Sequence, residues 1–312
     1  MSKADVPVRF GVVGLGRMGA NLGRRALELG HEVVALDLDA EAVRRFAGDG
    51  GISAYSVADL ATKLTSPRII LMYVPHGEPV DEVLENLLPV LEEGDVVADC
   101  GNSHWDDARR RHSLLQKRGV HYLDVGTSGG LEGASRGASF MVGGDKDAFG
   151  LIEPLLIALA VDPQGVFYAG PPGAGHFVKI VHNGIEFGMV QAIAEGVAQL
   201  DAWPGDLDIK GLLAHWNHGS VIRGWLIELA ADALSEGIVL DELSNYVEDT
   251  GEVKWLLHWS IDRDVPTPVT SAAQTSLMQY RDENFVQAKM HALIRHGFGG
   301  HPLRRTSSAG RS

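Results

Sequence analysis

The stretch that most constrains the fold is a glycine-rich turn between a short apolar run at residues 8–13 and a helical pattern that extends to residue 29. The turn reads Gly14-Leu15-Gly16-Arg17-Met18-Gly19. In a G-x-G-x-x-G turn of this kind the first glycine permits a tight bend, the second lets the backbone approach a pyrophosphate, and the third lets helix and strand pack closely. A purely structural glycine turn is the alternative, but the order of strand, turn and helix favours dinucleotide binding.

A second strand, predicted over residues 31–36, ends at Asp37, where dinucleotide-binding folds carry an acidic residue. A carboxylate at this point accepts hydrogen bonds from the adenosine ribose and repels a 2′-phosphate, and Leu38 supplies no positive charge to offset that repulsion. NAD is therefore the predicted cofactor. NADP remains possible because Arg44 and Arg45 follow closely in the sequence.

Strands and helices continue to alternate to about residue 170, which indicates a parallel, doubly wound sheet of the Rossmann type. Ligands bind beyond the carboxyl ends of such strands, and small residues with spare amides and hydroxyls stand there. A plain turn is the alternative for Gly129 and Gly130. The residues predicted to bind the cofactor are Gly14, Leu15, Gly16, Arg17, Met18, Gly19, Asp37, Val74, Pro75 and Asn102.

Beyond residue 170 the apolar period is helical throughout, so an all-α domain is expected to follow the Rossmann domain. The predicted domains are an NAD-binding Rossmann domain at 1–170, a helical substrate-binding and oligomerisation domain at 171–303, and a flexible tail at 304–312. After a first long helix, the predicted helices lie at residues 207–217, 221–235, 239–247, 252–262 and 268–296.

That long helix is expected over residues 173–200, after the helix-breaking sequence Pro-Pro-Gly. Lys179, His182, Asn183 and Glu186 stand at i, i+3, i+4 and i+7, so they share one face among many apolar residues. Burying an unpaired charge is costly, and this pattern therefore favours a polar cavity. An ordinary solvated stripe is the alternative.

Composition excludes several functional classes. The formal net charge of −14 over 312 residues disfavours nonspecific nucleic-acid binding, and no apolar run is long enough to span a membrane. The single cysteine, Cys100, cannot form an intrachain disulfide, so a cytoplasmic location is the expectation. His215 and His218 have no third ligand at a suitable spacing, and no metal site is predicted.

With these residues in view, the chain resembles the short type of decarboxylating 6-phosphogluconate dehydrogenases, within the β-hydroxyacid dehydrogenase superfamily. The likeness covers nearly the whole length, and its marks are Gly101-Asn102-Ser103, Ser128-Gly129-Gly130 and Lys179-Ile180-Val181-His182-Asn183-Gly184-Ile185-Glu186. The resemblance implies NAD-dependent oxidation of 6-phosphogluconate and its decarboxylation to ribulose 5-phosphate, as in the pentose phosphate pathway or gluconate utilization.

The acid–base chemistry that these residues can perform agrees with the reaction that the resemblance implies. Oxidation of a secondary alcohol needs a base, and Lys179 can serve if its surroundings disfavour the charged form. As an ammonium it then stabilises the oxyanion that appears when carbon dioxide leaves. Glu186 is the predicted acid that protonates the resulting enediol, and Asn183 is the third predicted catalytic residue.

The resemblance also implies a substrate site. The residues that it predicts to bind the substrate are Asn102, Ser128, Gly129, Gly130, His182, Arg223, Lys254, Arg295 and His301. In the family the last two come from a neighbouring subunit, which implies a homodimer or homotetramer with shared active sites.

Two departures bear on phosphate recognition. Phe187 stands where the family has a phosphate-binding tyrosine, and two residues are inserted before Lys254. Two other functions stay open. One is a related dehydrogenase of a smaller or unphosphorylated hydroxy acid, and the other is a noncatalytic dinucleotide sensor.

Overall fold

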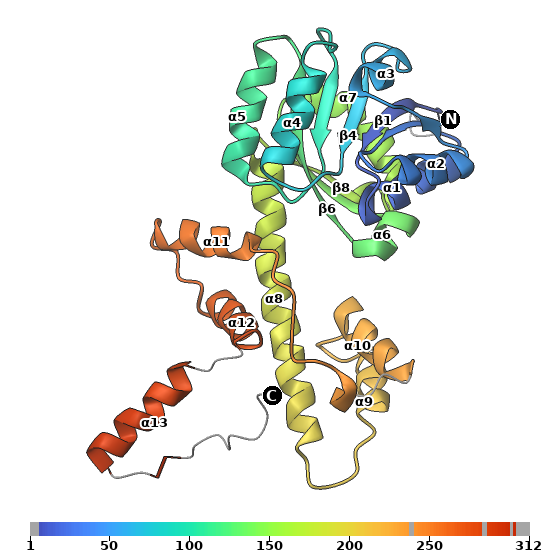
Figure 1. Cartoon of the computed structure of the whole chain (residues 1–312). Coiled ribbons are helices and arrows are strands. Elements are labelled where there is room, and N and C mark those ends of the chain that lie inside the picture. Colours follow the sequence, from blue (N-terminus) through green and yellow to red (C-terminus); the bar gives the residue numbers. More distant parts are fainter. Residues whose placement is uncertain (1–5, 237–239, 283–285, 300–301, 304–312) are drawn as a thin grey trace, which may run out of the picture. The chain divides into compact units, whose positions relative to one another are not determined.

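The computed structural model describes residues 6–236, 240–282, 286–299 and 302–303, apart from the side chains of residues 241 and 297–299 (Figure 1). The chain divides into two compact units, and the division falls inside one long helix. Unit 1 consists of Met1–Ile185 and Glu252–Asp264, and unit 2 consists of Glu186–Gly251 and Val265–Ser312.

Unit 1 is built on an eight-stranded sheet with the order β3-β2-β1-β4-β5-β6-β7-β8. The strands are β1 (Arg9–Val13), β2 (Glu32–Leu36), β3 (Ile52–Ser53), β4 (Ile69–Met72), β5 (Val96–Asp99), β6 (His121–Ser128), β7 (Ser139–Gly143) and β8 (Val166–Gly170). The order reverses between β1 and β4, which is the switch point of a doubly wound fold. The predicted Rossmann class is therefore confirmed.

One strand pair corrects the prediction of a fully parallel sheet. β6 and β7 are antiparallel, with Asp124 opposite Gly143 and Ser128 opposite Ser139. The two strands are joined by a short helix, α6 (Gly130–Arg136), and a connection of this length reverses the chain without a full crossover. All other neighbouring strands are parallel, as predicted.

Helices cover both faces of the sheet. Those of unit 1 are α1 (Arg17–Glu28), α2 (Ala40–Gly48), α3 (Val57–Thr62), α4 (Glu78–Leu87), α5 (Trp105–Gln116), α6, α7 (Lys146–Leu159), the first part of α8 (Ala174–Asp201) and α11 (Glu252–Ile261), with a 3-10 turn η2 (Pro163–Gly165). One core layer lies under α1, α6 and α7, and the other lies under α3, α4 and α5.

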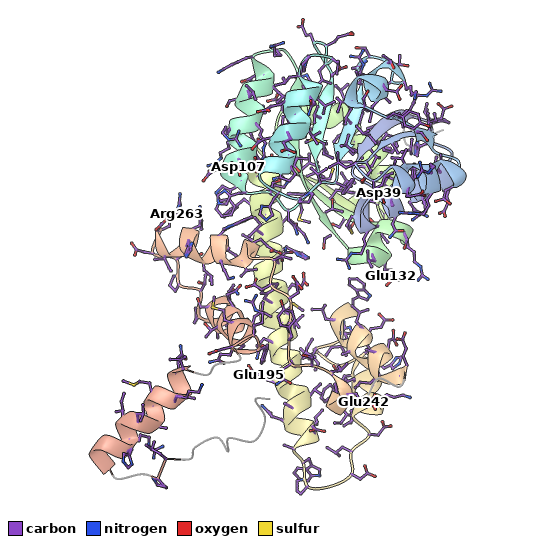
Figure 2. The ribbon with its side chains drawn as sticks, viewed as in Figure 1. Asp39, Asp107, Glu132, Glu195, Glu242 and Arg263 are labelled. Atoms are coloured by element: carbon purple, nitrogen blue, oxygen red, sulfur yellow. The ribbon has the colours of Figure 1, made fainter. Side chains whose placement is uncertain are left out.

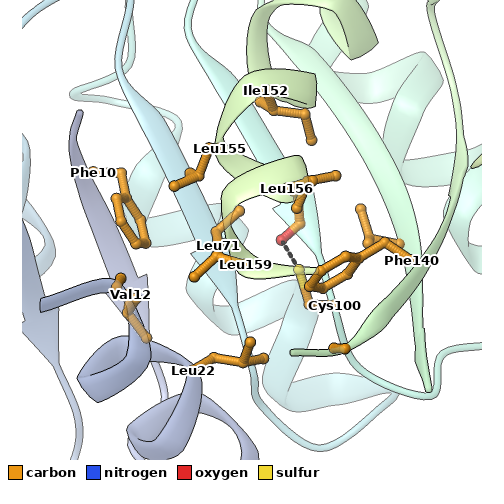
Figure 3. Packing of buried hydrophobic residues seen from close by; sticks show 14 of the residues in the cluster. Phe10, Val12, Leu22, Leu71, Cys100, Phe140, Ile152, Leu155, Leu156 and Leu159 are labelled. Atoms are coloured by element: carbon orange, nitrogen blue, oxygen red, sulfur yellow. Dashed lines mark hydrogen bonds between the residues drawn. The ribbon is translucent and has the colours of Figure 1, made fainter. Parts of the chain in front are cut away.

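The two core layers explain why the strands are unbroken apolar runs. Successive side chains of a strand point to opposite faces, so in β4 Leu71 enters one layer while Ile70 and Met72 enter the other. Figure 3 shows the layer under α7, where Leu156 and Cys100 are among the packed side chains. Burial raises the pKa of the Cys100 thiol, so this cysteine is a core residue in its neutral form.

Unit 2 is helical, as predicted. It contains the rest of α8, followed by α9 (Ile209–Trp216), α10 (Trp225–Ser235), a 3-10 turn η3 (Leu240–Glu242), α12 (Pro268–Gln279) and α13 (Val286–Gly299). Its core is small, with Leu213, Ile227 and Ala231 buried and Ile193 of α8 packed against them.

The helix predicted at residues 239–247 is wrong. Of that stretch only the three residues of η3 are helical in the part of the chain that is described. Further on, Ser244 Oγ accepts a hydrogen bond from the amide of Tyr246, and local bonds of this kind compete with the helical ladder.

The single helix predicted at residues 268–296 is two helices. α12 closes with a tight turn in which the amide of Asp282 donates to the carbonyl of Gln279, three residues before it. Arg281 is held in this turn by Asp249, with Nη2 2.7 Å from Oδ2. These contacts end the helix before α13 begins.

Acidic side chains lie on the surface of both units. Figure 2 shows Asp39 and Glu132 of unit 1 and Glu195 of unit 2, and all three are exposed. Among the described residues, no helix combines the length and the apolar character that crossing a bilayer requires.

Candidate active site

The glycine turn between β1 and α1 leaves space at its middle glycine. Gly14 has a φ of 95°, and a Cβ atom there would lie 2.4 Å from the carbonyl oxygen of Tyr73. A Cβ at Gly19 would lie 2.0 Å from the carbonyl oxygen of Gly14, so α1 packs directly on the turn. At Gly16, by contrast, a Cβ would have no described atom within 4 Å. The backbone is therefore open where a pyrophosphate would approach the start of α1.

The side chains between these glycines differ in exposure. Leu15 is buried, Met18 is half-buried and Arg17 is exposed. Leu15 therefore anchors the turn in the core, while the Arg17 side chain stands in solvent at the first position of α1.

Asp37 ties the end of β2 to the glycine turn. Its Oδ2 accepts from the amide of Leu15 at 2.5 Å, and its Oδ1 accepts from the amide of Asp39 at 2.7 Å. Each oxygen retains a second lone pair, so the same carboxylate can accept from a ribose hydroxyl.

Arg44 and Arg45, the two arginines that kept NADP as an alternative cofactor, both form ion pairs with acidic side chains. Arg45 lies 3.4 Å from Asp39, measured from Nη2 to Oδ2, and Arg44 pairs with Glu41. These partners reduce the positive charge that a 2′-phosphate would meet beside Asp37, which favours NAD.

The loops after β4 and β5 lie side by side at the carboxyl edge of the sheet. A Cβ atom at Gly101 would lie 2.9 Å from the carbonyl oxygen of Val74. The neighbouring Pro75 and Asn102 are both exposed. The rim formed by these two loops therefore contains three residues that the sequence predicts to bind the cofactor, Val74, Pro75 and Asn102.

The buried carboxylate of Asp99 holds this rim in place. It accepts from Ser103 Oγ at 2.7 Å and from the Tyr122 hydroxyl at 2.8 Å. Arg111 is fully buried, with Nη1 3.5 Å from Asp99 Oδ2 and Nε 2.9 Å from Asp81 Oδ1. Burial opposes the charge of Arg111 most strongly, but these acidic and phenolic neighbours hold its pKa above the usual value.

Asp124, at the centre of β6, fixes the start of α8. Its carboxylate is fully buried and accepts from the amides of Gly173 at 2.8 Å and His176 at 2.9 Å. Gly173 directly precedes α8 and His176 lies in its first turn, where amides have no partner within the helix, so Asp124 caps it. The Nε2 of His176 lies 3.1 Å from the carbonyl oxygen of Asp99. The Asp124 carboxylate and the Asp99 backbone carbonyl thus both fix α8 against the sheet.

Lys179 comes one turn later and lies against a glycine of β6. A Cβ atom at Gly126 would lie 2.4 Å from the Cβ of Lys179, so glycine is required for this approach. The lysine is 7% exposed, and its Nζ lies 3.4 Å from His182 Nδ1. The predicted base is therefore buried at the carboxyl edge of the sheet.

A row of hydrogen bonds runs through this site. Ser128 Oγ lies 3.1 Å from His182 Nε2, and His182 Nδ1 lies 3.2 Å from Asn183 Oδ1. Asn183 Nδ2 then donates to Glu252 Oε1 at 3.1 Å. The row joins the end of β6 through α8 to the first residue of α11, all within unit 1.

Gly129 and Gly130 follow Ser128 and form the entry to α6. Both have positive φ angles, 116° at Gly129 and 58° at Gly130, and glycine adopts these without strain. Gly129 is the N-cap of the helix, so the two glycines make a specific turn beside the Ser128 hydroxyl.

α11 brings Lys254 and several aromatic rings to unit 1. The Trp255 ring lies 5.0 Å from the His76 ring and 5.2 Å from the His104 ring, measured between centroids. Burial lowers the pKa of His104, so this contact is made by a neutral imidazole. Lys254 itself is half-buried.

Two further predicted site residues lie in unit 2 on α8 and beside α10. Glu186 follows Lys179 by seven residues on the same helix and is half-buried. Arg223 is exposed and donates from Nη1 to the carbonyl oxygen of Ser220 at 3.1 Å. It lines a hollow of about 540 Å³ together with His218.

The predicted residues near the C-terminus are only partly described. Arg295 is exposed on α13 and lines a second hollow with His291 and Pro302. His301 lies outside the described residues.

Glu252 is the site residue that sequence reasoning missed. It is 5% exposed and bonds directly to Asn183, one of the predicted catalytic residues. The sequence held one signal, an acidic residue at the start of a predicted helix, but solvated first-turn acids are common. Within the described part of the chain, His, Cys, Asp and Glu side chains form no group of three that could hold a metal ion.

Two models of one protein family match the chain. Residues 9–170 match the model of the NAD binding domain of 6-phosphogluconate dehydrogenase, and residues 175–254 match that of the 6-phosphogluconate dehydrogenase C-terminal domain. The chain is 41% identical over 297 residues to a putative 6-phosphogluconate dehydrogenase, YqeC, of Bacillus subtilis, covering 94% of this chain and 98% of the relative.

Two more relatives extend this comparison. The NAD(+)-dependent, decarboxylating 6-phosphogluconate dehydrogenase of Haloferax volcanii is 40% identical over 299 residues, covering 96% of this chain and 99% of the relative. The solved structure of Plasmodium falciparum 6-phosphogluconate dehydrogenase, studied with NADP+ and with 6-phosphogluconate, matches with a TM-score of 0.82 and 27% identity. That match covers 97% of this chain and 67% of the longer Plasmodium chain.

Proposed function

Because the chain belongs to the 6-phosphogluconate dehydrogenase family, we propose that it oxidises 6-phospho-D-gluconate to D-ribulose 5-phosphate and carbon dioxide with reduction of NAD. The matching family models and relatives confirm the family resemblance that was predicted from the sequence. The observation that carries the proposed reaction is the buried Lys179 beside His182 and Asn183, at the carboxyl edge of a dinucleotide-binding sheet.

The cofactor is held by the glycine turn and by Asp37. Gly16 leaves the backbone open to a pyrophosphate, and the Asp37 carboxylate accepts from the adenosine ribose. The nicotinamide of the bound cofactor supplies the acceptor for the hydride from the substrate C3. The paired states of Arg44 and Arg45 support NAD as the preferred form.

Lys179 acts twice in the proposed mechanism. As the neutral amine it takes the proton of the C3 hydroxyl during oxidation. As the ammonium it donates a hydrogen bond to the new C3 carbonyl, and it stabilises the oxyanion that forms as the C1 carboxylate leaves as carbon dioxide. The close approach of the Lys179 Cβ to Gly126 fixes the point from which the lysine side chain extends into the site.

Glu186 returns a proton to C1 of the enediol. It lies two helical turns beyond Lys179 on the same face of α8. The acid and the base can therefore reach neighbouring atoms of one substrate. Glu186→Gln is expected to slow formation of ribulose 5-phosphate more than hydride transfer. Accumulation of the 3-keto acid in a quenched reaction is the measurement that checks this order.

The remaining polar residues bind the substrate. The carboxylate and hydroxyls are held by Asn102, Ser128, Gly129, Gly130, His182 and Asn183. The phosphate is held by Arg223 and Lys254, together with Arg295 and His301 of a neighbouring copy. Phe187 supplies no hydroxyl here, so the cations carry the recognition of the phosphate. In domain terms, residues 1–170 form the NAD-binding domain and supply the first four of these residues, and residues 171–303 form the helical domain that supplies the others and self-associates.

Self-association as a homodimer or homotetramer with shared active sites is part of the proposal. It is supported by α13, whose Val286, Met290, Leu293 and Ile294 stand on one face and are each more than half exposed. Lys179→Met and Arg295→Met subunits should each be inactive alone. A mixture should regain activity, because one site of each hybrid dimer has both residues intact. A mixture that stays inactive after subunit exchange would count against shared sites.

The cytoplasm is the proposed location. The single cysteine, Cys100, is buried and free, which suits a reducing compartment.

Substrate choice provides the test of the function. The purified chain should reduce NAD with 6-phosphogluconate and should be much slower with gluconate, which lacks the phosphate. Arg223→Met should raise the KM for 6-phosphogluconate and leave the KM for gluconate unchanged. Equal turnover of both acids would instead support a dehydrogenase of unphosphorylated hydroxy acids.

A further inference from the structure

Glu252 is a buried carboxylate that the proposed reaction does not use. It is 5% exposed, and its Oε1 accepts from Asn183 Nδ2 at 3.1 Å. Asn183 is itself 6% exposed and contacts His182 through its other terminal atom. Glu252 therefore reaches His182 through a single intervening side chain, that of Asn183.

The chemistry of a carboxylate fixes the orientation of Asn183. An ionised carboxylate only accepts hydrogen bonds, so the Asn183 amide must turn its NH2 group toward Glu252. Its carbonyl oxygen Oδ1 then faces His182 Nδ1 at 3.2 Å. The opposite amide orientation would place two acceptors together beside Glu252 and is disfavoured.

The orientation of Asn183 in turn fixes the proton on His182. Because Oδ1 only accepts, His182 must carry its hydrogen on Nδ1 to bond with it. The Nε2 atom of the neutral ring then accepts from the hydroxyl of Ser128, which lies 3.1 Å away. Every contact of the row then has one donor and one acceptor.

We propose that Glu252 is a positioning residue that acts through Asn183 to hold His182 in the Nδ1-protonated tautomer and so directs the Ser128 hydroxyl onto His182 Nε2. Of the charged side chains, Lys179 contacts the ring directly, with Nζ 3.4 Å from Nδ1, and Glu252 acts from α11 through Asn183.

Lys179 links the tautomer to the reaction. Its Nζ lies 3.4 Å from His182 Nδ1. An amine lone pair can accept from an N–H group, whereas an ammonium has only donors. The Nδ1-protonated ring therefore matches the neutral lysine that takes the proton of the substrate hydroxyl. This consequence rests on the proposed function, but the tautomer itself does not.

The tautomer can be measured without substrate. In the full-length protein labelled with 15N-histidine, ring correlation spectra near neutral pH report which nitrogen carries hydrogen, and the His182→Gln variant identifies the His182 signal. The expected result is hydrogen on Nδ1 alone. Hydrogen on Nε2 alone, or on both nitrogens, would overturn the proposal.

Two substitutions of Glu252 separate positioning from bulk. Glu252→Gln keeps the shape but can donate or accept, so both orientations of Asn183 become possible and His182 should show a mixture of tautomers. Glu252→Asp keeps an acceptor-only carboxylate and should retain the Nδ1 tautomer. An unchanged single tautomer in Glu252→Gln would contradict the proposal. Glu85→Gln, at an exposed position of α4, is the matched control and should change nothing.

Turnover provides the second readout. Glu252→Gln should lower kcat for 6-phosphogluconate about 3- to 10-fold, the effect of one lost hydrogen bond, and leave the KM for NAD unchanged. A raised KM for NAD with normal kcat would show a general structural role instead. If the wild-type chain does not oxidise 6-phosphogluconate, the proposed function fails, and the spectra still decide the positioning role.

Discussion

Gly126 and Lys179 are matched in size across β6 and α8: a Cβ atom at Gly126 would lie 2.4 Å from the Cβ of Lys179. The carbonyl oxygen of Gly175 would lie 3.0 Å from the same added atom, so α8 could accommodate that atom only if the helix backbone moved. The position of the proposed base therefore depends on a glycine on a strand.

Gly126→Ala should displace Lys179 and reduce activity far more than stability. Overpacking of this kind costs about 1–3 kcal/mol, whereas a shift of about 1 Å in a catalytic group can cost about 100-fold in rate. Thermal unfolding and kcat measured on the same sample compare the two effects. Gly150→Ala is the control, since an added Cβ there meets no described atom within 4 Å. Normal kcat in Gly126→Ala would show that α8 can move without consequence.

Asp37→Ala should weaken the selection of NAD over NADP. The change removes the acceptor of the Leu15 amide and the negative charge that repels a 2′-phosphate. The ratio of kcat/KM for NAD to that for NADP should fall by about tenfold or more, which corresponds to about 1.4 kcal/mol. An unchanged ratio would show that Asp37 does not set the cofactor preference.

Arg111 and Arg110 both pair with Asp81 but should differ in their effect on stability. Arg111 is fully buried between Asp81 and Asp99, whereas the side chain of Arg110 is 53% exposed. Arg111→Leu leaves Asp99 without its buried cation and should cost about 3–5 kcal/mol in the free energy of unfolding. Arg110→Leu should cost less than about 1 kcal/mol. Urea denaturation measures both, and equal costs would contradict this account.

His31 should make the protein less stable in mild acid. Burial lowers the pKa of His31, whose Nδ1 accepts from the amide of Val8 at 3.1 Å. The unfolded chain therefore binds more protons once the pH falls below about 6.5. The stabilisation by neutral His31 is complete above that pH and is lost as the pH falls toward the folded-state pKa.

The variant His31→Asn keeps an acceptor for the Val8 amide but does not titrate. Between about pH 7.5 and 5.5 its free energy of unfolding should fall less than that of the wild type. His258→Asn, at an exposed site, should follow the wild-type curve. Parallel curves for the wild type and His31→Asn would remove His31 as a cause of acid sensitivity.

Much of unit 1 could be predicted because its constraints are local. The strands are apolar runs that must fill two core layers, and the glycine turn has its own sequence pattern. No residue ranges were predicted for the short helices α2, α3 and α6, whose six to nine residues give little periodicity, although α9, with eight residues, lies within the predicted helix at 207–217. The reversal at β7 could not be foreseen either, since an apolar run carries no information about strand direction.

The candidate site was predictable where its residues share one helix. The spacing of Lys179, His182 and Asn183 is enough to predict that they share one helix face, and a hydrogen bond joins the last two directly. Glu252 was not predictable, because its burial depends on how α11 packs on α8 through aromatic contacts such as that of Phe177 with Trp259. Sixty-nine residues separate Glu252 from Asn183, and sequence spacing says nothing about that contact.

The most direct test of the central claim follows both products of one reaction. With 6-phosphogluconate labelled at the C1 carboxylate, NADH formation and release of labelled carbon dioxide are measured together for the wild type and for Lys179→Met. The account predicts one carbon dioxide for each NADH in the wild type, and neither product from Lys179→Met although that variant still binds NAD. NADH without carbon dioxide in the wild type, or near-normal turnover in Lys179→Met, would contradict it.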